Sequence, residues 1–159
     1  MNDHSKTAME LFKQRYNCSQ AVFAAFADEL DMDQETAVKI ASSFGGGMGS
    51  MREVCGAVTG MFMAAGIKYG YSDPSKKKKK KEHYKLIQEL AATFRMENGS
   101  IICRELLGIR PEGENLVPRE RTDDYYKKRP CAEYVGYAAQ ILEKKIMEKE
   151  ESNEQNNKS

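Results

Sequence analysis

The sequence feature that most constrains this fold is a glycine-rich segment, residues 44–50 (FGGGMGS), that leads directly into a helical pattern. It contains four glycines: Gly45, Gly46, Gly47 and Gly49. Because glycine readily adopts positive φ angles and is unfavourable inside helices, this loop should interrupt the preceding helix and approach a neighbouring group closely. Ser50 and Glu53 match an S-x-x-E capping box, which predicts that the next helix begins at Met51.

This predicted helix, from Met51 to Gly70, combines an apolar face with a cysteine in its first turns. The apolar residues recur three and four positions apart: Val54, Val58, Met61, Phe62 and Ala65. Gly56 and Gly60 leave a smooth strip on which a second helix can pack closely. Cys55 should lie near the positive end of the helix dipole, beside free N–H groups of the loop. These conditions favour the thiolate over the thiol.

Helical periodicity recurs along the rest of the chain, without an alternating apolar pattern long enough for a strand. Apolar faces and cap residues predict helices over residues 7–16, 18–30, 36–44, 84–96, 101–107 and 131–146. Asp73 and Pro74 resemble a helix start, and Lys76 to Lys81 should form a solvated, partly frayed first turn or linker. We therefore predict an all-α fold, a compact bundle of five to seven helices around one core.

Two segments lack this periodicity. Residues 110–128 contain prolines, a glycine and many charges, which predicts a long surface loop. Residues 148–159 are polar and charged, which predicts a disordered tail after a single domain of residues 1–147. His4 and His83 lie near a chain end and a lysine run, so we expect both to be solvated surface residues.

Four cysteines, Cys18, Cys55, Cys103 and Cys131, each fall at or near a predicted helix start. Helix N-termini lower thiol pKa values and attract anions. If these ends pack together, four thiolates would face one point suited to a metal or an iron–sulfur cluster, with N–H groups from the Gly45–Gly49 loop donating to sulfur. Cysteine can also act simply as a small core residue. No C-x-x-C pair is present, so the fold itself must assemble any such site.

Composition and motifs argue against several function classes. The formal net charge of +1 gives no field that would indicate a nucleic-acid partner. No stretch is long and apolar enough for a membrane span or resembles a leader, so we expect a cytoplasmic protein without a membrane partner. The glycine loop lacks the Lys-Ser/Thr of a P-loop, which argues against a nucleotide, and C-x-x-C-H is absent, which argues against haem.

At Cys55 to Gly60 the sequence CGAVTG resembles the C-G-A-x-x-G motif of the C_GCAxxG_C_C family, whose members are described as redox-active. NCSQAV around Cys18, the FGGGMG loop, CRELLG from Cys103 and the final Cys131 resemble its other characteristic segments, over about residues 10–147. The family is similar in part to an iron–sulfur domain of split-Soret-type cytochromes. This resemblance implies that the four cysteines are cluster ligands, whereas the haem-binding elements of those cytochromes have no counterpart here.

Three functions remain open from the sequence. The first is an electron-transfer protein whose four cysteines hold an iron–sulfur or other metal centre and serve a redox partner protein. The second is a thiol–disulfide oxidoreductase in which two of the cysteines cycle. The third is a structural or binding module in which the cysteines hold zinc or fill the core. The oligomeric state is also open, and a homodimer is compatible with the sequence.

Overall fold

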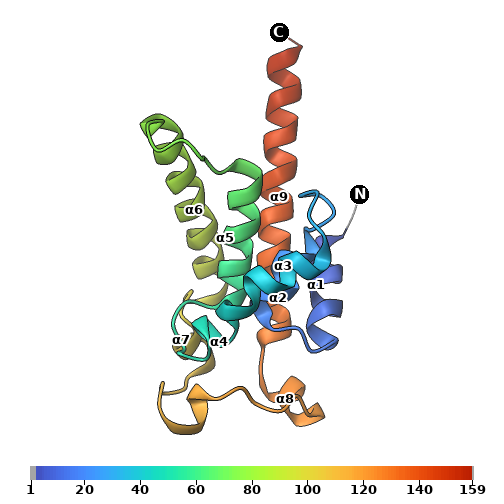
Figure 1. The fold of residues 1–159 in the computed structure, drawn as a ribbon, viewed down its shortest axis with the longest axis vertical. Helices are drawn as coiled ribbons and strands as arrows, with labels where there is room; N and C mark the ends of the chain where they lie inside the picture. The colour runs from blue at the N-terminus through green and yellow to red at the C-terminus, as the bar shows by residue number, and fades with distance from the viewer. Residues whose placement is uncertain (1–2, 159) are drawn as a thin grey trace.

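The computed structural model describes residues 3–158 as an all-α protein (Figure 1), which confirms the predicted fold class. Its α-helices are α1 (His4–Lys13), α2 (Cys18–Ala25), α3 (Gln34–Ala41), α4 (Gly45–Met48), α5 (Gly56–Tyr69), α6 (Lys77–Asn98), α7 (Cys103–Leu107), α8 (Asp123–Lys128) and α9 (Cys131–Asn157). Two 3₁₀ helices, η1 (Ser42–Phe44) and η2 (Gly113–Leu116), complete the order. The count exceeds five to seven because α4, α7 and α8 are helices of one or two turns. None of the helices within residues 3–158 is both long and apolar enough to cross a bilayer.

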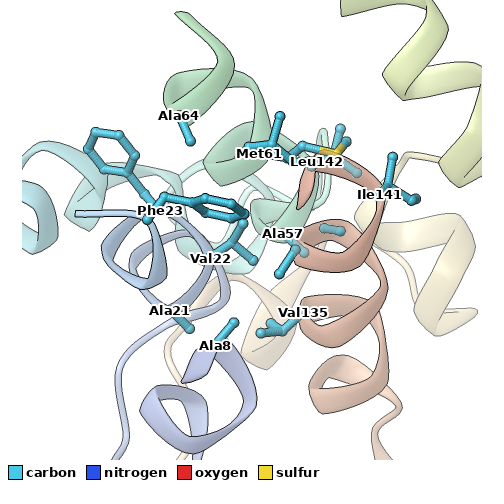
Figure 2. Close-up of a cluster of buried hydrophobic side chains, with 14 of the residues drawn as sticks. Ala8, Ala21, Val22, Phe23, Ala57, Met61, Ala64, Val135, Ile141 and Leu142 are labelled. Carbon is cyan, nitrogen blue, oxygen red and sulfur yellow. The ribbon is translucent and has the colours of Figure 1, made fainter. Parts of the chain in front are cut away.

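The core forms where α9 packs against α1, α2 and α5, with α6 on the far side of α5 and α9 (Figure 1). Large side chains such as Phe23, Met61 and Leu142 interlock there with alanines, which bring the helix axes close together (Figure 2). The smooth strip predicted on α5 is present, because a Cβ atom on Gly60 would lie only 2.7 Å from the carbonyl oxygen of Ser19 in α2. The close packing of α2 against α5 therefore depends on glycine.

The start of α5 differs from the prediction. Ser50 and Arg52 have φ angles of 65° and 62°, so neither has helical geometry, and α5 begins only at Gly56. The intervening residues run extended beside the segment before α7, where the Cys55 N–H donates to the Ile101 carbonyl at 2.8 Å. The predicted capping box is therefore wrong, because pairing with a segment distant in sequence competes with the local helix signal. The predicted end at Gly70 is confirmed.

The start of α6 also lies later than the sequence indicated. The Asp73 carboxylate accepts hydrogen bonds from the N–H and hydroxyl of Ser75 at 2.9 and 2.7 Å, which closes a local turn instead of a helix cap. Helix α6 begins at Lys77, so that residues 77–81 form its exposed first turns, as expected for a solvated lysine run. It ends at Gly99, which has a φ angle of 91°.

Two polar segments contain more helix than we predicted. Residues 110–128, expected to be one loop, include η2 and α8, and the Thr122 hydroxyl caps α8 by accepting from the N–H of Tyr125. Of residues 148–159, expected to be disordered, residues 148–157 continue α9, and Ser159 lies outside the described residues. This part of α9 is rich in Glu, Lys and Gln, which have high helix propensity, and Lys145 pairs with Glu148 one turn away.

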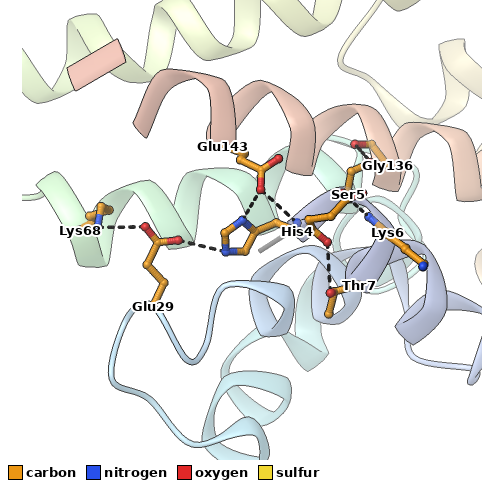
Figure 3. Close-up of polar contacts among 9 residues, drawn as sticks. His4, Ser5, Lys6, Thr7, Glu29, Lys68, Gly136 and Glu143 are labelled. Atoms are coloured by element: carbon orange, nitrogen blue, oxygen red, sulfur yellow. Dashed lines mark hydrogen bonds and ion pairs between the residues drawn. The ribbon is translucent and has the colours of Figure 1, made fainter. Parts of the chain in front are cut away.

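The prediction that His4 is a solvated surface residue is wrong, because the side chain is buried. It is 7% exposed and stacks on Phe26, with ring centroids 4.2 Å apart, instead of being solvated. Its Nδ1 lies 2.7 Å from a Glu143 carboxylate oxygen and its Nε2 lies 3.0 Å from one of Glu29 (Figure 3). Lys68 in α5 pairs with the same Glu29 at 3.3 Å. His4 therefore ties the start of α1 to α9 and to the segment after α2. His83 is half-buried.

Candidate functional site

Each of the four cysteines begins a helix, as the sequence predicted. Cys18, Cys103 and Cys131 are the first residues of α2, α7 and α9, and Cys55 is the N-cap of α5. The clearest local cause is a full capping box before Cys18, in which the Asn17 side chain accepts from the Gln20 N–H and the Gln20 side chain accepts from the Asn17 N–H. The four positions thus follow from cap and backbone signals that act separately at each helix.

The fold brings these four helix starts together. All four cysteines line one cavity of about 50 Å³, close to the end of the bundle that carries α7 and the start of α9 (Figure 1). Phe12, Leu106, Leu107, Tyr125 and Tyr134 supply most of the remaining apolar wall. The cysteines therefore form a single site, and α2, α5, α7 and α9 each contribute one sulfur.

Three glycines make this approach sterically feasible. A Cβ atom on Gly56 would collide with the Sγ of Cys18, and one on Gly47 would lie 2.6 Å from the Cβ of Cys103. Gly45 is pressed against the Asn17 side chain in the same way. A larger residue at any of these positions would push the cysteine-bearing helix starts apart.

The glycine loop itself is a tight left-handed turn. Gly46, Gly47 and Gly49 have φ angles of 65°, 70° and 62°, and Gly46 also lines the cysteine cavity. The loop bonds partly to itself, because the Ser50 N–H donates to the Gly45 carbonyl at 3.2 Å and the Gly49 N–H donates to the same carbonyl. That its other N–H groups donate to a bound sulfur stays a prediction. The predicted cofactor-binding roles also stay untested for Gly45, Gly46, Gly47, Gly49 and Gly56.

Burial changes the expected chemistry of the thiols. It raises the pKa of Cys55 well above its ordinary value, and the nearby sulfur of Cys18 raises it further. Burial and Cys18 likewise raise the pKa of Cys131 to about 12. The amide groups of Ala57 and Val58 lower the pKa of Cys55, but they do not compensate. The predicted thiolate at Cys55 is therefore wrong for the protein without a ligand, since desolvation outweighs the helix dipole.

The pKa of Cys103 is also raised, although a buried arginine lies beside this thiol. Burial raises its pKa, while Arg52 lowers it through a hydrogen bond from its Nη1 to the Sγ at 3.7 Å. Arg52 is 3% exposed, and its Nε also donates to the Asn115 carbonyl at 2.7 Å. The buried guanidinium group of Arg52 therefore contacts one of the four thiols directly.

Two more arginines, Arg121 and Arg129, line the cavity, and no aspartate or glutamate does. Arg121 donates to the carbonyls of Phe12 and Tyr16 at 3.2 and 3.0 Å and lies over the Phe12 ring at 4.2 Å. The sequence pattern did not single out these three arginines. Arg52 lies inside the helix predicted from Met51, Arg121 lies in the predicted surface loop, and Arg129 precedes the predicted last helix. For Arg121 and Arg129 the available signal was the number of arginines between η2 and α9, which we interpreted only as loop charge.

The thiols of the site are neither paired in disulfides nor arranged around a single metal ion, as far as residues 3–158 show. All four cysteines are free, with no disulfide between them. Within residues 3–158, no three His, Cys, Asp or Glu side chains are arranged to hold a single metal ion. The site therefore consists of four separate thiols around a small cavity with basic walls.

The fold and the site together define a small all-α protein with one four-cysteine centre. The family model described as "Putative redox-active protein (C_GCAxxG_C_C)" matches residues 16–145, and the chain belongs to this family. This match confirms the resemblance to the family, over a range that includes Cys18, Cys55, Cys103 and Cys131. Comparisons with curated proteins and with solved structures gave no match.

Proposed function

We propose that this protein is an electron carrier whose four cysteines, Cys18, Cys55, Cys103 and Cys131, hold an iron–sulfur cluster. The observation that supports this most is that all four thiols line one cavity to which arginines contribute and carboxylates do not. A set of four cysteine ligands is typical of such clusters, which supply one-electron transfer. A cytoplasmic location and a protein as electron donor or acceptor belong to the same proposal.

The electrostatics of the cavity suit a bound centre with a net negative charge. Without one, the raised pKa values of Cys55 and Cys131 keep these thiols protonated. Iron binding replaces those protons and removes the mutual repulsion of the thiolates. The positive charges of Arg52, Arg121 and Arg129 would then offset the net negative charge of a cluster with four thiolate ligands.

Four thiolate ligands would suit either a zinc ion or an iron–sulfur cluster. We favour the cluster because the matching family is described as redox-active, whereas zinc has no redox chemistry.

The direct test is anaerobic purification followed by analysis of iron, zinc and acid-labile sulfide. We expect iron and sulfide in the wild type and a marked loss of both in Cys55→Ser and Cys103→Ser. Met96→Ser is the matched control, because Met96 is 88% exposed on α6. Wild-type protein free of iron, or full iron in both cysteine variants, would refute the proposal. Zinc without sulfide would favour the structural alternative.

A thiol–disulfide function is the second candidate. It is favoured by Cys18, whose sulfur is close enough to raise the pKa of both Cys55 and Cys131. Two such thiols would form one disulfide by losing two protons and passing two electrons to a disulfide acceptor. Differential alkylation after treatment with oxidised glutathione should then find Cys18 paired. Four alkylatable thiols after this treatment would exclude the second candidate.

A further inference from the structure

We propose that a groove beside the cysteine cavity is a binding site for a small tetrahedral oxyanion. The groove has a volume of about 250 Å³. Four arginines line it, Arg52, Arg119, Arg121 and Arg129, together with hydrogen-bonding groups that include Asn17 and Ser50. No aspartate or glutamate is among its lining residues. This inference concerns the groove alone and does not depend on which centre the cysteines hold.

The four guanidinium groups lack the carboxylate partners that surface arginines commonly have. Within residues 3–158, the one arginine in an ion pair is Arg104, which contacts Glu53 at 3.0 Å. Arg52 is almost fully buried and bonds to a carbonyl and a thiol, neither of which carries a formal negative charge. Burial of a cation without a counter-ion carries a desolvation cost, and a bound anion would reduce that cost.

The arginines are also held in place in advance of any ligand. Arg121 lies over the rings of Phe12 and Tyr125, and Arg129 lies over the same Tyr125 ring at 5.1 Å. The Nη2 of Arg119 donates to the Asn115 side-chain oxygen at 3.0 Å. Side chains fixed in this way lose little conformational entropy when they bind, so a larger part of each interaction contributes to affinity.

The chemistry of the lining selects the ligand class. Guanidinium groups present paired N–H donors that match the oxygens of phosphate, sulfate and related anions. They come from separate parts of the chain: Arg52 from the turn after the glycine loop, Arg119 and Arg121 from the segment before α8, and Arg129 from the start of α9. A tetrahedral oxyanion presents oxygens in several directions and can accept from donors on several walls at once.

The groove adjoins the redox site directly. Arg52, Arg121, Arg129 and Tyr125 line both the groove and the cysteine cavity. An oxyanion in the groove would therefore contact arginines that also line the cysteine cavity.

Calorimetric titration with sodium sulfate and with sodium phosphate, at ionic strength held constant with chloride, tests the site. We use the reduced protein as purified and measure its iron content in the same sample, so that loss of iron and loss of anion binding are distinguished. We expect saturable binding in the wild type and at least tenfold weaker binding in Arg119→Gln and Arg129→Gln. Arg95→Gln, an exposed position outside the groove, should bind like the wild type. Arg119 is exposed, so its variant should fold even if Arg129→Gln does not.

Thermal unfolding provides a second readout. Saturating sulfate should raise the melting temperature of the wild type, and it should do so less in Arg119→Gln. Absence of saturable binding in the wild type would overturn the proposal. Equal weakening in Arg119→Gln and Arg95→Gln would also overturn it, since that result would mean unspecific attraction to positive charge.

Discussion

Gly56, the first residue of α5, lies directly against the Sγ of Cys18 at the first turn of α2, with no room for a Cβ atom between them. This contact makes the spacing of two cysteine-bearing helices depend on the absence of one methyl group. The residue after Cys55 therefore positions a sulfur that belongs to another helix.

Replacement of Gly56 by alanine should separate α2 from α5 and lower the free energy of unfolding by about 1–3 kcal/mol, the usual cost of overpacking. Iron content should fall with it if the cysteines hold a cluster. Gly66→Ala is the matched control in the same helix, since nothing lies within 4 Å of its new Cβ atom. It should stabilise the protein by about 0.5–1 kcal/mol, because alanine favours the helix. Urea unfolding of both variants checks this, and equal effects would contradict it.

The reduced, metal-free protein should lose stability in alkali. The pKa of Cys131 rises from 9.0 to about 12 in the native state. Between these values the unfolded chain has released this proton while the native protein retains it, so the free energy of unfolding falls as pH rises. The slope should approach about 1.4 kcal/mol per pH unit for this thiol.

Thermal unfolding of the wild type under reductant, from pH 8 to 11, measures this slope. Cys131→Ser should flatten it, because serine does not titrate in this range. The pKa of Tyr69 is also raised to about 12, mainly by burial, so Tyr69→Phe serves as the companion variant that accounts for its share. A Cys131→Ser profile as steep as that of the wild type would argue against a buried neutral thiol.

Arg52 should be important for stability even without a bound cofactor. Arg52→Gln removes the donors to Cys103 and Asn115 and should lower the free energy of unfolding by about 2 kcal/mol. Arg104→Gln, which breaks a surface ion pair with Glu53, should cost at most about 1 kcal/mol. Chemical denaturation compares the two. An equal or smaller effect at Arg52 would show that its buried contacts add nothing.

The His4 contacts should anchor α1 to the bundle. Glu143→Gln removes the carboxylate that lies 2.7 Å from His4 Nδ1 and accepts from the His4 N–H, and should destabilise the protein by about 1.5–3 kcal/mol. The exposed pair of Lys78 and Glu82, 4.0 Å apart, provides the control, since Lys78→Gln should change stability by less than about 0.5 kcal/mol. Urea unfolding at pH 6 measures both variants. Indistinguishable values would mean that the His4 contacts do not hold the helix.

Local signals in the sequence failed where distant segments paired. Ser50 and Glu53 fit a capping box, yet the chain from Met51 to Cys55 runs beside the residues before α7, where the Cys103 N–H donates to the Glu53 carbonyl at 2.6 Å. Glu53 pairs with Arg104 instead of capping a helix. The prediction for His4 was wrong for a related reason, because distant segments also cover this residue. A residue near the chain end was expected in solvent, but α9 and the segment after α2 cover it.

Caps, glycines and apolar periodicity act over a few residues, so the sequence alone predicts the all-α class and a cysteine at the start of four helices. That the four sulfurs share one cavity lined by Arg52, Arg121 and Arg129 depends on how the helices pack. Packing also reversed the expected ionisation of Cys55. A helix dipole is a local property that the sequence reveals, whereas desolvation depends on every element packed around the thiol, and here desolvation is the larger effect.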